Sequence, residues 1–288
     1  MDSLVIGLLQ FLVTIANLAL VASGLAIVFG MMRVINFAHG EFLMLGGYAA
    51  IVSNQAGLNL WVAMFIVAPV VVGLVGAILE RLVIRRLYGR MIDTMLATWG
   101  ISLALIGIAT IVFGNRVAGI SPPLGSLSIG QYAIGWYELF LVAVVAVLFF
   151  AGWLFLRFTP AGLVARGTMQ NRQMAGALGI DPNRVYAVTF AVGAAVTGLA
   201  GALISPIAGV VPSIGAVYIA KAFITVISGG TAILAGTLAS ATVLGSVNTF
   251  FSFLLSPVLG EVALLMAAVV LLRILPRGIS GSFFRRSL

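Results

Sequence analysis

The sequence is a series of long apolar segments separated by short polar connections. Apolar segments of about 20 residues have the length that crosses the hydrocarbon core of a bilayer as a helix. Nine such segments are predicted, or eight if one glycine-rich segment re-enters the membrane without crossing it. They are Leu4–Met31, Arg33–Ser53, Leu60–Ile84, Met91–Phe113, Tyr137–Leu156, Val185–Ser205, Pro206–Ser228, Thr231–Leu255 and Gly260–Leu275. The pattern predicts an all-α, polytopic membrane protein with a single transmembrane domain over residues 1–288.

The main polar interruption is the segment 157–184, which lies between the fifth and sixth predicted spans. Thr159 can cap a helix whose first residue is Pro160, a position that needs no backbone donor. Gly179 fits the end of that helix, and Asp181–Pro182 fits the start of the next span. The segment therefore predicts one short surface helix that is held at both ends.

Two groups of side chains lie on different faces of this predicted surface helix. Helical spacing places Arg166, Gln170 and Gln173 on one face, and it places Met174 and Leu178 on another. A small apolar knob with polar residues around it suits a groove on a soluble partner domain. The alternative is a solvated loop whose arginines only fix the topology. We favour docking because the segment has capped ends and helical spacing.

The composition supports the membrane prediction. Hydrophobic residues make up 62% of the chain and charged residues only 8%, which is typical of polytopic membrane proteins and not of soluble domains. A net charge of +8 would favour nucleic acid as the partner of a soluble protein. Here the arginines gather beside predicted spans, so the expected partner is the lipid bilayer and no nucleic acid is expected.

The arginines also predict which side of the membrane each connection faces. Three segments carry four arginines each: Arg81, Arg85, Arg86 and Arg90; Arg157, Arg166, Arg172 and Arg184; and Arg273, Arg277, Arg285 and Arg286. The polar connection 115–136 carries only Arg116. By the positive-inside rule the three arginine-rich segments are cytoplasmic and the connection 115–136 is outside. Nine spans then place the N-terminus outside and the C-terminus in the cytoplasm.

The sequence offers little for catalysis. The chain has one histidine and no cysteine, which excludes histidine-based metal cages, disulfides and thiolate chemistry. It lacks the GxSxG and GxxxxGK[ST] motifs, so neither a serine hydrolase elbow nor a nucleotide-binding phosphate loop is predicted. No cofactor and no metal are expected on this chain, which is not predicted to be an enzyme. If transport is driven by ATP, the motor must be another polypeptide.

Polar residues within the predicted spans are candidates for a translocation path, because charge in the membrane is costly and usually functional. They are Asn36, His39, Glu41 and Lys221. Simpler alternatives stay open. His39 and Glu41 can lie at a hydrated membrane edge or pair with Arg33, Lys221 can snorkel to an interface, and Glu261 can cap the last helix.

Two interrupted stretches occupy similar places in the two halves of the chain. The stretches 29–47 and 205–230 are rich in glycine and proline, and each follows a long predicted span. An internal inverted repeat with broken helices near the substrate path gives this pattern. The alternative is that small residues are common in membrane helices for packing alone.

Four blocks resemble a known family. VINFAHGEFLMLGGYAA, TMLATWGISL, QNRQMAGALGIDPNRVYAVTFAVGAAVTGLAGAL and IAKAFITVISGG are similar to permease subunits of the branched-chain amino acid ABC importer family, in order over residues 24–278. The resemblance implies a bacterial inner-membrane permease that receives its solute from a periplasmic binding protein. It also implies a second homologous permease subunit, identical or different, and two ATPase subunits that use ATP and magnesium. The implied ATPase-coupling residues are Arg166, Gln170, Asn171, Arg172, Met174, Leu178 and Gly179.

The resemblance leaves the solute open between two branches of the family. INFAHGE and AKAF look like the amino-acid branch, whereas ATWGISL, MQNRQMA and VVLLRILPRG look closer to permeases for urea and short-chain amides. Thr231, Ala232 and Asn248 depart from the amino-acid pattern. We expect branched-chain or related amino acids, with urea or amides as the alternative. Rival classes are an ion-coupled secondary transporter or channel using Lys221, His39 and Glu41, and a structural scaffold.

Overall fold

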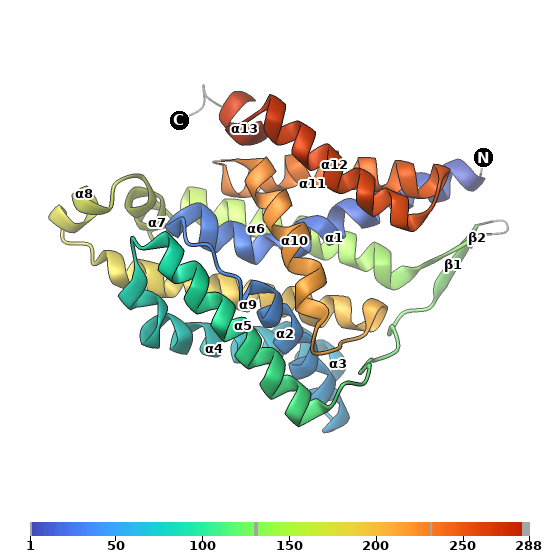
Figure 1. Ribbon diagram of the computed structural model, residues 1–288. Coiled ribbons are helices and arrows are strands. Elements are labelled where there is room, and N and C mark those ends of the chain that lie inside the picture. Colours follow the sequence, from blue (N-terminus) through green and yellow to red (C-terminus); the bar gives the residue numbers. More distant parts are fainter. Residues whose placement is uncertain (1, 130–131, 231, 284–288) are drawn as a thin grey trace. The chain divides into compact units, whose positions relative to one another are not determined.

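The computed structural model describes residues 2–129, 132–230 and 232–283 (Figure 1). Within them the chain is almost entirely helical. The elements are α1 (Asp2–Met32), α2 (His39–Gln55), α3 (Leu60–Val62), the π-helical turn η1 (Ala63–Val67), α4 (Ala68–Leu82), the 3₁₀ turn η2 (Ile84–Leu87), α5 (Met91–Phe113), β1 (Ser126–Ile129), β2 (Tyr132–Gly135), α6 (Trp136–Phe158), α7 (Pro160–Gln170), α8 (Arg172–Ala177), α9 (Pro182–Ala208), α10 (Ile214–Gly229), α11 (Ile233–Leu254), α12 (Pro257–Ile274) and α13 (Gly278–Phe283). Thr231, Arg285 and Arg286, to which predictions above refer, lie outside the described residues.

Seven helical segments among the described residues are long and apolar enough to cross a membrane. They are Val5–Met32, Leu60–Leu82, Met91–Phe113, Trp136–Phe158, Pro182–Ala208, Ile233–Leu254 and Pro257–Gly281. These match seven of the predicted spans, which confirms a polytopic all-α protein. The two other predicted spans are also helical but shorter, with 17 residues in α2 and 16 in α10. They overlap the two interrupted stretches 29–47 and 205–230. The inverted repeat stays a prediction.

The chain forms two compact units. One contains Met1–Ala22, Pro122–Gly152 and Lys221–Leu288, and the other contains Ser23–Ser121 and Trp153–Ala220. The single-domain organisation stays a prediction. We call them the terminal unit and the central unit and describe each by itself.

The core of the central unit is α9 packed against α4 and α2. Small residues allow these helices to approach closely, as is common in membranes. A Cβ added to Gly46 on α2 would run into the backbone of Gly198 on α9, and one added to Gly201 would run into the backbone of Leu43. Before α4, the π turn η1 accommodates Pro69, which cannot donate a backbone hydrogen bond.

The polar connection 115–136 is not simply a loop. It contains an antiparallel hairpin in which Ser126 faces Gly135 and Ile129 faces Tyr132. The hairpin was not predicted, since strands of four residues leave only a short alternating pattern in the sequence. Earlier in the same connection, Ala118 pairs with Val210 within the central unit.

The terminal unit contains a tight helical hairpin of α11 and α12. Ser256 caps α12 by accepting a hydrogen bond from the backbone nitrogen of Leu259, and a Cβ on Gly260 would lie 2.7 Å from the carbonyl oxygen of Asn248. The short α13 is held to the start of α11, because the hydroxyl of Ser280 accepts a hydrogen bond from the backbone of Ala232 at 2.9 Å.

Candidate functional site

The polar segment 157–184 begins as the sequence predicts. Pro160 is the first residue of α7, and the hydroxyl of Thr159 accepts a hydrogen bond from the backbone nitrogen of Gly162 at 2.9 Å. Gly162 packs on the end of α6, where an added Cβ would lie 2.7 Å from the Cα of Leu156. This contact fixes the direction in which α7 leaves the preceding span.

The segment does not form one helix, and that prediction is wrong. Asn171 adopts an extended backbone conformation between α7 and α8, and its side chain accepts a hydrogen bond from the backbone nitrogen of Met174 at 2.9 Å. Asparagine side chains compete in this way with helical hydrogen bonding and favour helix starts. The predicted common face is also wrong, because Arg166 and Gln170 lie on α7 whereas Gln173 lies on α8.

The far end of the segment agrees with the sequence prediction. Gly179 has a φ of 83°, which favours glycine, and a Cβ added there would meet no atom within 4 Å. The glycine is therefore required by the backbone and not by packing. Asp181 then caps α9 by accepting a hydrogen bond from the backbone nitrogen of Asn183 at 2.9 Å.

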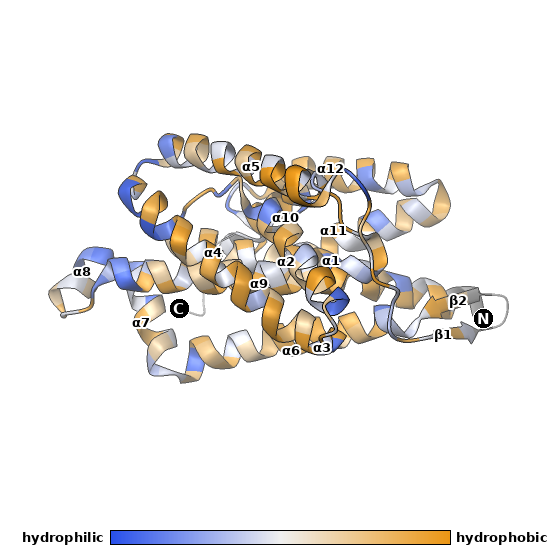
Figure 2. Cartoon of the chain, turned by 90° about the horizontal axis from the view of Figure 1, so that it is seen from below, coloured by the Kyte–Doolittle hydropathy of each residue, from blue (hydrophilic) through white to orange (hydrophobic). Residues whose placement is uncertain are grey.

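The short helix α8 presents apolar side chains to its surroundings. The exposed fraction is 58% for Met174 and 74% for Leu178, whereas Ala175 faces inward and is buried. Gln170, Asn171, Arg172 and Gln173 are exposed around them, and Arg166 on α7 is half-buried. Figure 2 shows hydrophilic residues in α8 and along the connection leading into α5, while the long helices are mostly hydrophobic.

Arg172 is the first residue of α8 and turns back toward the body of the central unit. Its guanidinium lies over the rings of Tyr186 and Tyr88, at 5.2 and 5.9 Å from their centroids, and donates a hydrogen bond to the side chain of Asn183 at 2.9 Å. Such stacking suits the planar guanidinium group. The sequence analysis expected Arg172 to contact an ATPase subunit. It did not anticipate the contacts of Arg172 with Tyr88 and Tyr186.

Glu80 at the end of α4 is a second residue that the sequence analysis missed. It is only 1% exposed, and its carboxylate accepts two hydrogen bonds from Arg85 at 3.2 Å and one from the hydroxyl of Tyr88 at 2.5 Å. Burial and this hydrogen bond to Glu80 raise the pKa of Tyr88 above its ordinary value. The signal in the sequence was a carboxylate followed five residues later by Arg85 and eight residues later by Tyr88, both of which can donate hydrogen bonds to it.

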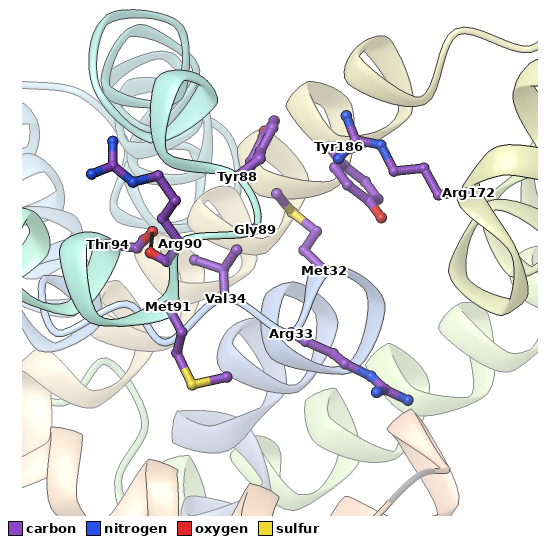
Figure 3. Close-up of a pocket in the computed structure, with 10 residues that line it drawn as sticks. All are labelled: Met32, Arg33, Val34, Tyr88, Gly89, Arg90, Met91, Thr94, Arg172 and Tyr186. Carbon is purple, nitrogen blue, oxygen red and sulfur yellow. Dashed lines mark hydrogen bonds between the residues drawn. The ribbon is translucent and has the colours of Figure 1, made fainter.

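A cavity of about 250 Å³ lies beside the two tyrosine rings. Met32, Arg33, Val34, Tyr88, Gly89, Arg90, Met91, Thr94, Arg172 and Tyr186 line it. Figure 3 shows the guanidinium groups of Arg33, Arg90 and Arg172 pointing in different directions. They therefore do not converge on one position, as a shared anion site would require.

Asn36, His39 and Glu41 are all buried near the start of α2. The side-chain oxygen of Asn36 accepts a hydrogen bond from the backbone of Ala38 at 3.0 Å, and the backbone of Phe37 donates to the hydroxyl of Thr98 at 3.0 Å. Both bonds shape the turn into α2. His39 and Glu41 are each 2% exposed, and the role of all three residues in a translocation path stays a prediction.

His39 and Glu41 contact hydroxyl groups of two neighbouring helices. The Nδ1 atom of His39 lies 3.3 Å from the hydroxyl of Thr197, which donates its only proton to the carbonyl of Gly193 at 2.8 Å. Glu41 hydrogen-bonds Ser102, while its Oε2 atom has no hydrogen-bond partner within the described part of the chain.

Lys221 belongs to the terminal unit, so it is described apart from the three residues of α2. Its ammonium group forms an ion pair with Glu261 at 2.6 Å, and the two side chains are 23% and 56% exposed. Ser256, and not Glu261, caps α12. The structure thus joins two residues that the sequence analysis treated separately.

Residues 7–275 match the family described as "Branched-chain amino acid transport system / permease component". The chain is 30% identical to the high-affinity branched-chain amino acid transport system permease protein LivH of Escherichia coli (strain K12), with 91% of each chain covered. It is 28% identical to the high-affinity branched-chain amino acid transport system permease protein BraD of Pseudomonas aeruginosa, again with 91% of each chain covered. A solved structure, PsaBC from Streptococcus pneumoniae in complex with Fab, aligns with a TM-score of 0.48 and 15% identity over 93% of this chain and 90% of that chain. The chain is a multi-pass membrane protein, and it belongs to the branched-chain amino acid transport system permease family.

Proposed function

We propose that this chain is the membrane-spanning permease subunit of an ATP-driven importer for branched-chain or related amino acids. The proposal assigns ATP and magnesium to two separate ATPase subunits and places a second homologous permease beside this chain. A periplasmic binding protein delivers the solute. The complex lies in a bacterial inner membrane, with the C-terminus of this chain in the cytoplasm. Membership of the family and the similarity to LivH and BraD support the solute class.

The observation that carries the proposal is the geometry of α7 and α8. Between the long helices α6 and α9, hydrogen-bonded caps hold the segment at Thr159, Asn171 and Asp181. The exposed side chains of Met174, on α8, and Leu178, directly after α8, provide a small apolar knob. Exposed apolar side chains with a polar rim are typical of docking surfaces. Movement of a docked ATPase would reach α6 and α9 through their fixed junctions with this segment.

The docking role can be tested by substituting the knob. We expect Leu178→Asp to reduce the recovery of ATPase subunits with the tagged chain by about tenfold, which corresponds to a loss of about 1.4 kcal/mol of binding free energy. Leu58→Asp is the matched control, because Leu58 is also an exposed apolar residue but lies in the connection between α2 and α3. Equal recovery with both variants would contradict docking through α8.

Transport by the reconstituted complex tests the driving force and the solute. In vesicles that contain this chain, its co-purified subunits and the binding protein, we expect leucine uptake that requires ATP. Uptake of urea or acetamide in place of leucine would assign the complex to the urea and amide branch. Uptake by this chain alone, driven by an ion gradient without ATPase subunits, would instead support a secondary transporter.

A further inference from the structure

A continuous line of contacts joins α8 to the end of α4. It starts at Arg172, whose position at the first residue of α8 is fixed by the Asn171 cap. The guanidinium group stacks over Tyr88 and Tyr186, and these rings meet edge to face with centroids 5.3 Å apart. Figure 3 shows the Arg172 side chain reaching toward the ring of Tyr186. Any displacement of α8 therefore acts directly on the two rings.

The other end of the line is the buried carboxylate of Glu80. A buried charge is tolerated only when partners satisfy it, and Tyr88 and Arg85 supply these hydrogen bonds. Arg85 lies within the 3₁₀ turn η2, and Tyr88 follows directly after the last residue of that turn. The turn thus presents both donors to Glu80 at once. Moving Tyr88 away would leave the carboxylate partly unsatisfied.

Two residues separate Tyr88 from α5, whose first turn is hydrogen-bonded to the same connection. The hydroxyl of Thr94 donates to the carbonyl oxygens of Leu87 and Arg90 at 3.1 and 2.8 Å. One turn later, the hydroxyl of Thr98 accepts the hydrogen bond from Phe37 at the entry to α2. The cavity beside the tyrosine rings leaves space into which they can shift.

We propose that Arg172, Tyr88 and Glu80 form a relay that couples the position of α8 to the α4–α5 connection and, through α5, to the start of α2. The proposal rests on the proposed function, because it assigns the route by which ATPase movement at α8 reaches the helices. All three are positioning residues and do not contact the solute. Tyr88 is the central member, since its ring contacts Arg172 and its hydroxyl contacts Glu80.

Tyr88→Phe tests the relay with a minimal change. The variant keeps the ring under Arg172 and removes only the hydrogen bond to Glu80. We expect the amount of solute moved per ATP hydrolysed to fall by about fivefold, the lower end of typical coupling between sites, because Arg85 still holds Glu80. ATPase recovery with the tagged chain should equal that of the wild type, which separates failure of the relay from failure of the proposed function.

Tyr186→Phe is the matched control. Among the described residues, Tyr186 makes its contacts with Arg172 and Tyr88 through its ring. Tyr186→Phe therefore removes a neighbouring tyrosine hydroxyl and leaves the contacts between Arg172, Tyr88 and Glu80 in place. We expect it to keep the wild-type ratio of solute moved to ATP hydrolysed. An equal fall in both variants would overturn the relay, and so would a wild-type ratio in Tyr88→Phe.

A double-mutant cycle gives a second, independent readout. Glu80→Gln should also lower the amount of solute moved per ATP hydrolysed. In the double variant of Tyr88→Phe with Glu80→Gln, this amount should be no lower than in the more affected single variant. Additive losses would show that the two side chains act separately and would overturn the relay. If Glu80→Gln does not accumulate in the membrane, the comparison of Tyr88→Phe with Tyr186→Phe decides alone.

Discussion

Replacing Gly46 by alanine should destabilise the central unit, because no space exists for a Cβ where α2 meets α9. A Cβ built on Gly46 would lie 2.6 Å from both the carbonyl carbon and the Cα of Gly198. Carbon atoms in contact normally lie about 3.5–4.0 Å apart, so the overlap is about 1 Å. The obstructing atoms belong to the backbone, and no change of rotamer can remove them. The two helices must therefore separate.

The cost of this separation follows from the neighbouring contacts. Gly201 on α9 packs against the backbone of Leu43, and Gly47 faces the side chain of Val210. A gap of about 0.5–1 Å removes about a quarter to a half of the dispersion energy of a contact. If about 30 atom pairs, each worth about 0.1–0.2 kcal/mol, lose that share, the free energy of unfolding falls by about 1–3 kcal/mol. Overpacked cores lose a similar amount.

Thermal unfolding in detergent measures this effect, with tryptophan fluorescence followed at a fixed scan rate. A loss of about 2 kcal/mol should lower the apparent Tm by about 4 °C in a chain of this size. Gly107→Ala is the matched control, because a Cβ there meets nothing within 4 Å on α5. This control should be neutral or gain up to about 1 kcal/mol from helix propensity. Gly46→Ala with an apparent Tm equal to or above that of Gly107→Ala would refute the close packing of α2 on α9.

Three further substitutions test the polar segment and the terminal unit. Gly179→Pro and Arg172→Glu should abolish uptake while the protein stays in the membrane, whereas wild-type uptake by both would contradict a coupling role for the segment. Thr159→Ala should destabilise the start of α7 by about 1 kcal/mol and speed limited proteolysis there, with Thr159→Ser as the control that keeps the cap. Lys221→Glu and Glu261→Lys should each lower the apparent Tm, and their combination should restore it; no recovery would show that the 2.6 Å ion pair adds nothing to stability.

The helix ends of the polar segment were predictable because their signals are local. Thr159 and Asp181 each accept a backbone hydrogen bond from a residue two or three positions later, so a short stretch of sequence contains both partners. Gly179 was identified for the same reason, since its positive φ depends on the backbone of one residue. The long apolar helices were equally accessible, because length and hydropathy alone define a span.

The interruption at Asn171 and the burial of Glu80, unlike these helix ends, could not be predicted from the sequence. Asn171 can continue a helix or start one, and only its hydrogen bond to Met174 in the folded chain decides between them. Glu80 stands next to Arg81 in a basic cluster, which is typical of a solvated span end. Its burial depends on the 3₁₀ turn that returns Arg85 and Tyr88 to it. Turns of this kind have no periodic signature in the sequence.

The candidate path residues now fall into two kinds that make different demands on transport. Asn36, His39 and Glu41 are each only 2% exposed, and their known partners are backbone or hydroxyl groups of the central unit. A solute can reach them only if α2 separates from its neighbours, and the glycine contacts with α9 make such a separation costly. The side chains of the Lys221–Glu261 pair, in contrast, are 23% and 56% exposed. A path role for the α2 residues therefore requires a conformational change. The proposed relay of Arg172, Tyr88 and Glu80, acting through α5 and the Thr98–Phe37 hydrogen bond, is one route by which α8 would supply it.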